Sequence, residues 1–127
     1  MASDHITHQL DAILEPLRVR VRFGELAIRE LTDYPKDIQK HILALILYRA
    51  KAGPLLKPHG LGEPLHGKLI GFTKIKSKSL SLRIIYRPRK IDELIHMEII
   101  AIGPREREEV YRNATKRVLR FRREMQE

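Results

Sequence analysis

The residues best suited to chemistry in this sequence are the basic side chains of one short stretch, residues 67–87. Runs of branched and aromatic residues at 69–76 and 80–87 predict a β-hairpin. Because side chains alternate along a strand, three lysines are expected to share one side of the first strand: Lys74, Lys76 and Lys78. In the second strand, Arg83 would lie between residues that point the other way. Grouped cations repel one another unless an anion lies among them, so the hairpin is either a solvated face or an anion-binding site.

The distribution of charge favours the binding site. The 127 residues carry a formal charge of +9, and nearly all of it falls in residues 67–127, which hold sixteen Lys and Arg against eight Asp and Glu. Such asymmetry indicates a polyanionic partner, with nucleic acid ahead of a membrane surface. An acidic protein partner would satisfy the same field.

Several other kinds of site are not expected. The sequence has no cysteine, and therefore no disulfide framework and no cysteine nucleophile or ligand. His59 and His66 lie in a Gly/Pro-rich loop without the ligand spacing of a metal site, so we expect no metal and no cofactor. No signal-peptide pattern is seen, and the longest apolar run, 42–48, is too short to cross a bilayer. We therefore expect a cytoplasmic protein without a membrane partner.

The basic hairpin must be held by the elements around it. Residues 3–15 predict an amphipathic helix, 17–23 a half-buried strand that alternates apolar and basic residues, and 24–34 and 35–52 a pair of helices. The first helix is expected to pack on the domain, although it could instead dock on a partner.

The second half of the chain completes a sheet. Residues 88–93 predict a polar turn, 94–102 a strand apolar on both sides, and 105–125 a helix that starts next to Pro104. The fold class is therefore α+β, with a small, twisted, mainly antiparallel sheet, an N-terminal helical hairpin and a C-terminal helix. Residues 1–16 are expected to form a helical extension, and residues 17–127 a single domain.

Two segments, read together, resemble the RelE/ParE superfamily of type II toxins, and specifically its mRNA interferase branch. Residues 73–86 (TKIKSKSLSLRIIY) are similar to that family's basic strand, short turn and arginine strand. Residues 99–119 (IIAIGPREREEVYRNATKRVL) are similar to its last strand, glycine, Arg-Glu-Arg block and the tyrosine that opens the C-terminal helix. The resemblance covers residues 17–120 and leaves the first helix outside it.

The resemblance implies five catalytic positions: Lys74, Lys76, Arg83, Arg105 and Tyr111. We also expect four neighbouring basic residues to bind RNA: Lys78, Arg87, Arg107 and Arg112. The sequence departs from the family pattern at Pro104, where a basic residue often precedes the arginine. It departs again at residues 80–82, which replace a more polar turn.

Cleavage of RNA by its own 2′-hydroxyl needs a base, cations to hold the charge on the phosphate, and an acid for the leaving 5′-oxygen. An isolated lysine, with a pKa of about 10.4, is a poor base, but crowded like charges favour the neutral form. We therefore expect Lys76, or the phenol of Tyr111, to be the base. Arg83 and Arg105 would clamp the phosphate and Lys74 would position the backbone. The acid is left open, because Arg105 is a reluctant donor.

No histidine acid/base pair is expected among these groups, so the protein should be a weak nuclease by itself. The resemblance implies that the ribosome presents mRNA in a reactive geometry, and that a cognate antitoxin covers the basic surface in a heteromeric complex. Two alternatives stay open: a non-enzymatic ParE-like toxin that inhibits DNA gyrase, and a basic nucleic-acid-binding module without catalysis.

Overall fold

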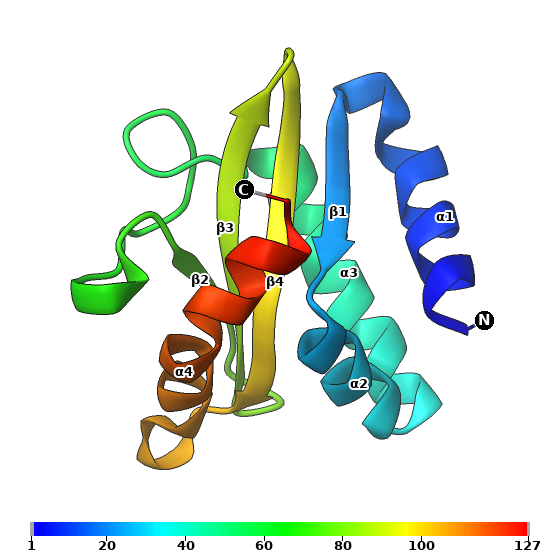
Figure 1. Cartoon of the computed structure of the whole chain (residues 1–127). Coiled ribbons are helices and arrows are strands. Elements are labelled where there is room, and N and C mark those ends of the chain that lie inside the picture. The colour runs from blue at the N-terminus through cyan, green and yellow to red at the C-terminus, as the bar shows by residue number, and fades with distance from the viewer. Residues whose placement is uncertain (1, 127) are drawn as a thin grey trace.

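The centre of the molecule is a four-stranded sheet with helices on both faces (Figure 1). The computed structural model describes residues 2–126, with side chains from residue 5 onward. In this range the helices are α1 (Ala2–Leu14), α2 (Glu25–Asp33), α3 (Lys36–Ala52) and α4 (Glu109–Glu124). The strands are β1 (Val19–Phe23), β2 (Thr73–Ser77), β3 (Leu82–Ile91) and β4 (Leu94–Pro104). This arrangement confirms the α+β architecture predicted from the sequence.

The strands lie in the order β1-β4-β3-β2, with β1 parallel to β4 and the other two pairings antiparallel. β4 is therefore a central strand, as its apolar pattern predicts, and it is buried from Met97 to Gly103. A register shift in β4 lets Ile100 and Ala101 both pack toward α4, while its neighbours pack toward the opposite face.

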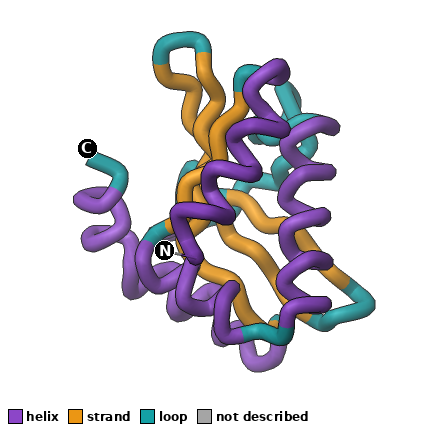
Figure 2. The backbone as a smooth tube through the Cα atoms, turned by 90° about the vertical axis from the view of Figure 1, so that its right-hand side faces the viewer, coloured by secondary structure: helices purple, strands orange, loops and turns teal. Residues whose placement is uncertain are grey.

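The two faces of the sheet have separate hydrophobic clusters, and Figure 2 shows helices on both sides of the strands. On one face, α1, α2 and α3 contribute Leu14, Leu31 and Ile46, all fully buried. On the other face, α4 contributes Val110 and Phe121. Because α1 supplies core residues, it packs on the body of the protein. Within residues 2–126, every helix is too short or too polar to cross a membrane.

The first strand of the predicted hairpin begins later than expected. β2 starts at Thr73, whereas residues 67–69 form a turn of 3₁₀ helix, η2 (Gly67–Leu69). Gly67 and Gly71 adopt φ angles of 63° and 89°, which are left-handed conformations that interrupt an extended strand. The residues before Thr73 therefore form a loop that packs beside the sheet.

The predicted polar turn at 88–93 is wrong, because β3 continues to Ile91 and pairs with β4 along its length. Pro88 is tolerated there because pairing with β2 ends at Tyr86, so no strand on that edge needs an N–H from Pro88. The turn itself is only Asp92 and Glu93, both with positive φ, as in tight hairpins.

The C-terminal helix also begins later than residue 105. β4 continues through Pro104, a 3₁₀ turn, η3 (Glu106–Glu108), follows, and α4 starts at Glu109. Arg107 and Glu108 both have φ of 54°, which is incompatible with a continuous right-handed helix. The stretch has no Ser, Thr, Asp or Asn to cap a helix at residue 105, so the later start agrees with its composition.

Candidate functional site

The β2–β3 hairpin brings lysine and arginine side chains to one face of the sheet. Lys76 lies opposite Arg83, and Lys74 lies opposite Ile85. Because Ile85 packs in the cluster beneath α4, Lys74, Lys76 and Arg83 all lie on the α4 side. Lys76 is exposed, and the other two are partly buried. The hairpin therefore presents three cations to the end of the sheet that α4 covers.

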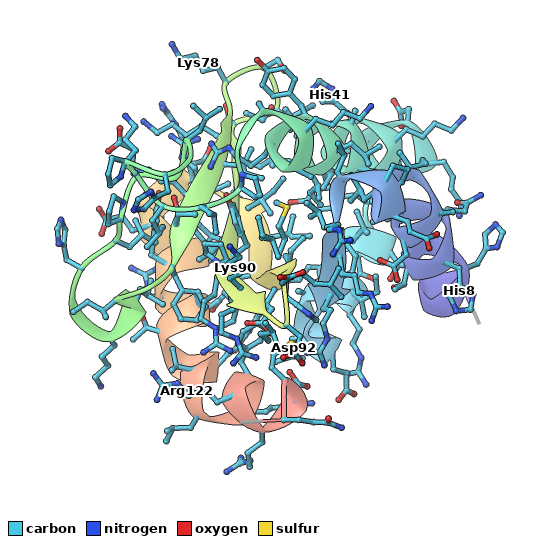
Figure 3. The ribbon with its side chains drawn as sticks, turned by 90° about the horizontal axis from the view of Figure 1, so that it is seen from above. His8, His41, Lys78, Lys90, Asp92 and Arg122 are labelled. Atoms are coloured by element: carbon cyan, nitrogen blue, oxygen red, sulfur yellow. The ribbon has the colours of Figure 1, made fainter. Side chains whose placement is uncertain are left out.

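Lys78 does not share this face, contrary to the expectation of a three-lysine stripe. It follows Ser77, the last residue of β2, so the alternation of the strand no longer applies to it. Figure 3, which looks down on the molecule, shows Lys78 projecting on the side away from Arg122 of α4.

The segment after β4 is fixed beside Arg83. The backbone N–H of Arg105 donates to the carbonyl of Ser81 at 3.0 Å, which ties the end of β4 to the β2–β3 turn. The Nη1 atom of Arg83 donates to the carbonyl of Leu82 at 3.1 Å. Across the sheet from Arg83, β4 has Gly103, which offers no side chain. The guanidinium of Arg83 therefore keeps most of its donors for another partner.

Tyr111, in the first turn of α4, lies next to the hairpin. The ammonium of Lys74 is 5.7 Å from the centroid of the Tyr111 ring, within cation–π range. Both side chains line an open groove of about 480 Å³, whose other walls include His66 and Glu108. The groove thus joins β2, the loop before it and the start of α4.

Tyr86, in β3, anchors the loop that carries His66. The hydroxyl of Tyr86, which is fully buried, donates to the carbonyl of Pro54 at 2.6 Å and accepts from Arg49 at 3.2 Å. Burial raises the pKa of Tyr86, so it stays a neutral donor. Tyr86 therefore has a structural role at the start of the 53–67 loop.

In the part of the chain that the structure describes, the cations of the site form no ion pairs, although Glu108 lines the same groove as Lys74. Within the described part of the chain, none of the following side chains forms an ion pair: Lys74, Lys76, Arg83 and Arg105. Their field reaches Glu63, whose pKa is lowered mainly by its hydrogen bond with Lys57 and to a lesser degree by Lys76 and Lys74. Unpaired cations at the edge of a groove are suited to an anionic ligand.

Arg87, expected to bind RNA, is placed inside the protein. It is 7% exposed, its Nε atom donates to Glu98 at 2.9 Å, and its guanidinium lies 5.6 Å from the ring centroids of both Phe72 and Phe121. A surface ligand cannot reach a side chain held in this way, so we assign Arg87 a structural role. Arg107 and Arg112 are exposed and flank Tyr111 in the sequence.

Sequence reasoning missed His66. The sequence suggests His66 only as a possible metal ligand, and it predicts no histidine acid/base pair at the site; the structure places this one histidine in the groove with Lys74 and Tyr111. The linear signal was weak, since the loop before β2 has no period that predicts which of its side chains meets α4. No group of three or more His, Asp or Glu suited to a metal ion occurs in residues 2–126.

Together the fold and the site define a small α+β protein in which Lys74, Tyr111 and His66 line one groove, and Lys76 and Arg83 lie on the same face of the adjoining hairpin. No family model matches the chain. A RelE-like toxin protein of Escherichia coli is 29% identical over 102 residues, which are 80% of this chain and 99% of the relative.

Solved structures of the E. coli toxin RelE also match the chain. A mutant of the E. coli toxin RelE in the free state matches with a TM-score of 0.59 at 26% identity, over 77% of this chain and 95% of that one. A RelE mutant in complex with an antitoxin RelB peptide matches with a TM-score of 0.53 at 24% identity, over 74% and 90% of the two chains, and supports the fold alone. The chain is thus similar in sequence and in fold to RelE toxins of E. coli, in agreement with the resemblance that its two segments carry.

Proposed function

We propose that this protein is the toxin of a type II toxin–antitoxin system and that it cleaves mRNA on translating ribosomes. The observation that carries the proposal is the grouping of Lys74, Lys76, Arg83 and Tyr111 at one end of the α4 face, with Arg105 tied to the adjoining turn. These residue types can bind a phosphodiester and stabilise the charge that builds on it during cleavage.

In this proposal, Arg83 and Arg105 hold the non-bridging phosphate oxygens, and Lys74 positions the backbone of the RNA. Lys76 or Tyr111 removes the 2′ proton, the 2′-oxygen attacks the phosphorus, and the bond to the 5′-oxygen breaks. The products are a 2′,3′-cyclic phosphate and a 5′-hydroxyl. No metal or other cofactor takes part. The exposed Arg107 and Arg112 provide further phosphate contacts.

His66 is the strongest candidate for the acid that protonates the leaving 5′-oxygen. It lines the same groove as Tyr111, and histidine is the side chain whose ordinary pKa places its charge change near neutral pH. General acid catalysis is most efficient with such a group. The ribosome would supply the orientation of the mRNA, which lowers much of the remaining barrier.

The partner that restrains the toxin is proposed to be an antitoxin with an acidic or amphipathic segment. The E. coli RelE mutant of similar fold is in complex with an antitoxin peptide. In this chain the unpaired cations around the groove provide a complementary surface for such a segment. Formation of the complex would cover the residues that bind RNA.

The test is to add the purified protein to a translating extract and to map breaks in a reporter mRNA by primer extension. Breaks should appear only with ribosomes, and should be lost in Arg83→Ala and Arg105→Ala but retained in the control Lys90→Ala. Lys90 is an exposed cation near the far end of β3. Intact message with full toxicity in the two arginine variants would contradict the proposal, and inhibited DNA supercoiling would then favour the gyrase-directed relatives.

A further inference from the structure

Beyond the end of β1, the last part of β4 has a helix rather than a strand along one edge. β1 ends at Phe23, which lies opposite Ile99, whereas β4 continues to Pro104. Figure 1 shows α2 following β1 along this edge, with α4 in front of the sheet. Ile100 and Ile102 are each 1% exposed, so their backbone groups are shielded from water. Such groups need partners within the protein, because an unpaired buried N–H or C=O is costly.

Two side chains take the place of the missing strand. A carboxylate oxygen of Glu30, in α2, accepts the N–H of Ile102 at 3.1 Å. The Nη1 atom of Arg117, in α4, donates to the carbonyl of Ile100 at 3.0 Å. The two side chains also bind each other twice, from Nη1 to Oε1 at 2.7 Å and from Nη2 to Oε2 at 2.9 Å. The planar fork of an arginine suits this double contact with a carboxylate.

The pair formed by Glu30 and Arg117 is better shielded from water than an ordinary surface ion pair. The side chain of Arg117 is 15% exposed and that of Glu30 is 24% exposed. Two parallel charge-assisted hydrogen bonds fix the orientation of both partners as well as their distance. The pair therefore holds α2, α4 and β4 together at one point, beside the bulge at Ile100.

This joint lies between the two segments that carry the proposed catalytic residues. Along β4, Ile102 is followed three residues later by Arg105, whose own N–H is bound to Ser81. Along α4, Arg117 comes six residues after Tyr111, which is about 9 Å of helix at 1.5 Å per residue. A change at the joint should therefore move the end of β4 relative to the start of α4.

We infer that Glu30 and Arg117 are positioning residues for the proposed cleavage. By replacing a strand beside β4, they hold Arg105 in place relative to Tyr111, and neither of them touches the RNA. The inference rests on the proposed function, in which the phosphate is clamped and a proton is moved by groups on these two segments. Catalysis is sensitive to such placement, since a displacement of about 1 Å can cost about 10²-fold in rate.

The test compares Arg117→Gln with the matched control Arg120→Gln. Arg120 also links α4 to α2, through Glu25 at 2.6 Å, and its bonds within residues 2–126 are to the side chains of Glu25 and Glu124 alone. Both variants therefore remove one positive charge and one ion pair between α2 and α4. Only Arg117→Gln also releases the backbone of β4.

The first readout is single-turnover cleavage of a reporter mRNA on ribosomes, over a range of protein concentrations. Arg117→Gln should lower the maximum rate about 10²-fold. Its half-saturating concentration should stay within about twofold of the control, because the cations proposed to bind RNA are all present. Circular dichroism at the assay temperature checks that each variant is folded. Equal maximum rates in the two variants, or a loss confined to the half-saturating concentration, would overturn the inference.

Glu30→Gln is a milder variant and keeps the test decisive if Arg117→Gln does not fold. The amide oxygen can still accept the N–H of Ile102, but the charge that holds both arms of Arg117 is lost. The maximum rate should fall about tenfold, as the loss of a charge-assisted hydrogen bond predicts. Glu25→Gln is its control and should stay within about twofold of the wild type. A folded Glu30→Gln with an unchanged maximum rate would overturn the inference.

Amide hydrogen exchange tests the geometry without cleavage. In Arg117→Gln the amides of Ile102 and Arg105 should exchange about tenfold faster than in the wild type, whereas Arg120→Gln should leave them within about twofold. Absence of ribosome-dependent cleavage by the wild type would defeat the proposed function. Unchanged exchange at Arg105 in Arg117→Gln would overturn the positioning role, whether or not the wild type cleaves mRNA.

Discussion

Arg83 and Arg87 lie on the same strand and the same face, four residues apart, yet their surroundings differ completely. Opposite Arg87 on β4 is Glu98, which binds it at 2.9 Å in a buried setting. Opposite Arg83 is Gly103, which has no side chain, and the other neighbour of Arg83 is Lys76, a second cation. The residue across the strand therefore decides whether an arginine stabilises the fold or is free to bind a ligand.

The comparison also shows how the protein accommodates its high positive charge. Where α4 covers basic side chains, carboxylates lie beside them: Glu98 pairs with Arg87, and Glu30 forms a two-pronged pair with Arg117. At the hairpin end, Lys74, Lys76 and Arg83 form no ion pairs within residues 2–126, and all three are more exposed than Arg87. Burying a charge without a partner is costly, so unpaired cations are confined to places where water or an anion reaches them.

The largest effect is expected from removing the carboxylate of the buried cluster. Glu98→Ala leaves Arg87 buried with no counter-charge, and should lower the free energy of unfolding by about 3–5 kcal/mol. Urea denaturation monitored by circular dichroism measures the change. Glu93→Ala is the control, because Glu93 pairs with Arg18 in a setting where both side chains are largely exposed, and little change is expected. A similar loss in both variants would show that burial of the pair is not the cause.

The next effect concerns activity and leaves stability unchanged. Arg83→Ala removes a donor to the phosphate and should reduce ribosome-dependent cleavage by about 10²–10³-fold. Arg83 pairs with no carboxylate among the described residues, so the melting temperature of the Arg83→Ala variant should stay near that of the wild type. The Arg87→Ala variant, which loses the bond to Glu98, should melt at a clearly lower temperature. If Arg83→Ala proved as destabilised as Arg87→Ala, the contrast between the two arginines would be lost.

Much of this contrast could not be predicted from the sequence, although the elements could. Apolar periodicity located the four helices and four strands, since patterns over five or more residues average out local exceptions. The pattern could not give the register of β3 on β4, and so it did not distinguish Arg87 from Arg83. Register depends on the bulge at Ile100 and on the long reach of β3 through Pro88, both set by packing.

The remaining misses also have physical causes. The late start of α4 depends on left-handed conformations at Arg107 and Glu108, residue types for which such angles are uncommon. The position of His66 depends on a loop whose path is fixed by the buried Tyr86 hydroxyl on Pro54. By contrast, the resemblance of two segments groups Lys74, Lys76 and Tyr111. Lys74 meets Tyr111 in the structure, and Lys76 lies on the same face of β2, because β2 and β3 pair as the fold requires.

The comparison can be sharpened by giving Arg83 the partner that Arg87 has. Gly103→Glu places a carboxylate on the residue opposite Arg83, and its Cβ is accommodated, because a Cβ at Gly103 meets Val110 at an ordinary 3.7 Å. Pairing should reduce cleavage by about tenfold, as competition for a charge-assisted hydrogen bond predicts. Gly103→Gln, of the same size but neutral, should lose much less activity. Equal losses would show that bulk near the groove, rather than charge, is responsible.

The smallest effect is expected at His96, which lies opposite Arg89 in the sheet, and it depends on pH. The pKa of His96 in the folded protein is lowered by burial and then by Arg22, so the unfolded chain binds the proton more readily. Stability should therefore be intact above the ordinary histidine pKa of about 6.5 and should fall as the pH drops through it toward the lower folded value. His96→Gln, which cannot titrate, should show a shallower loss in urea unfolding between pH 7.5 and 5. The same slope in both proteins would exclude His96 as the titrating group.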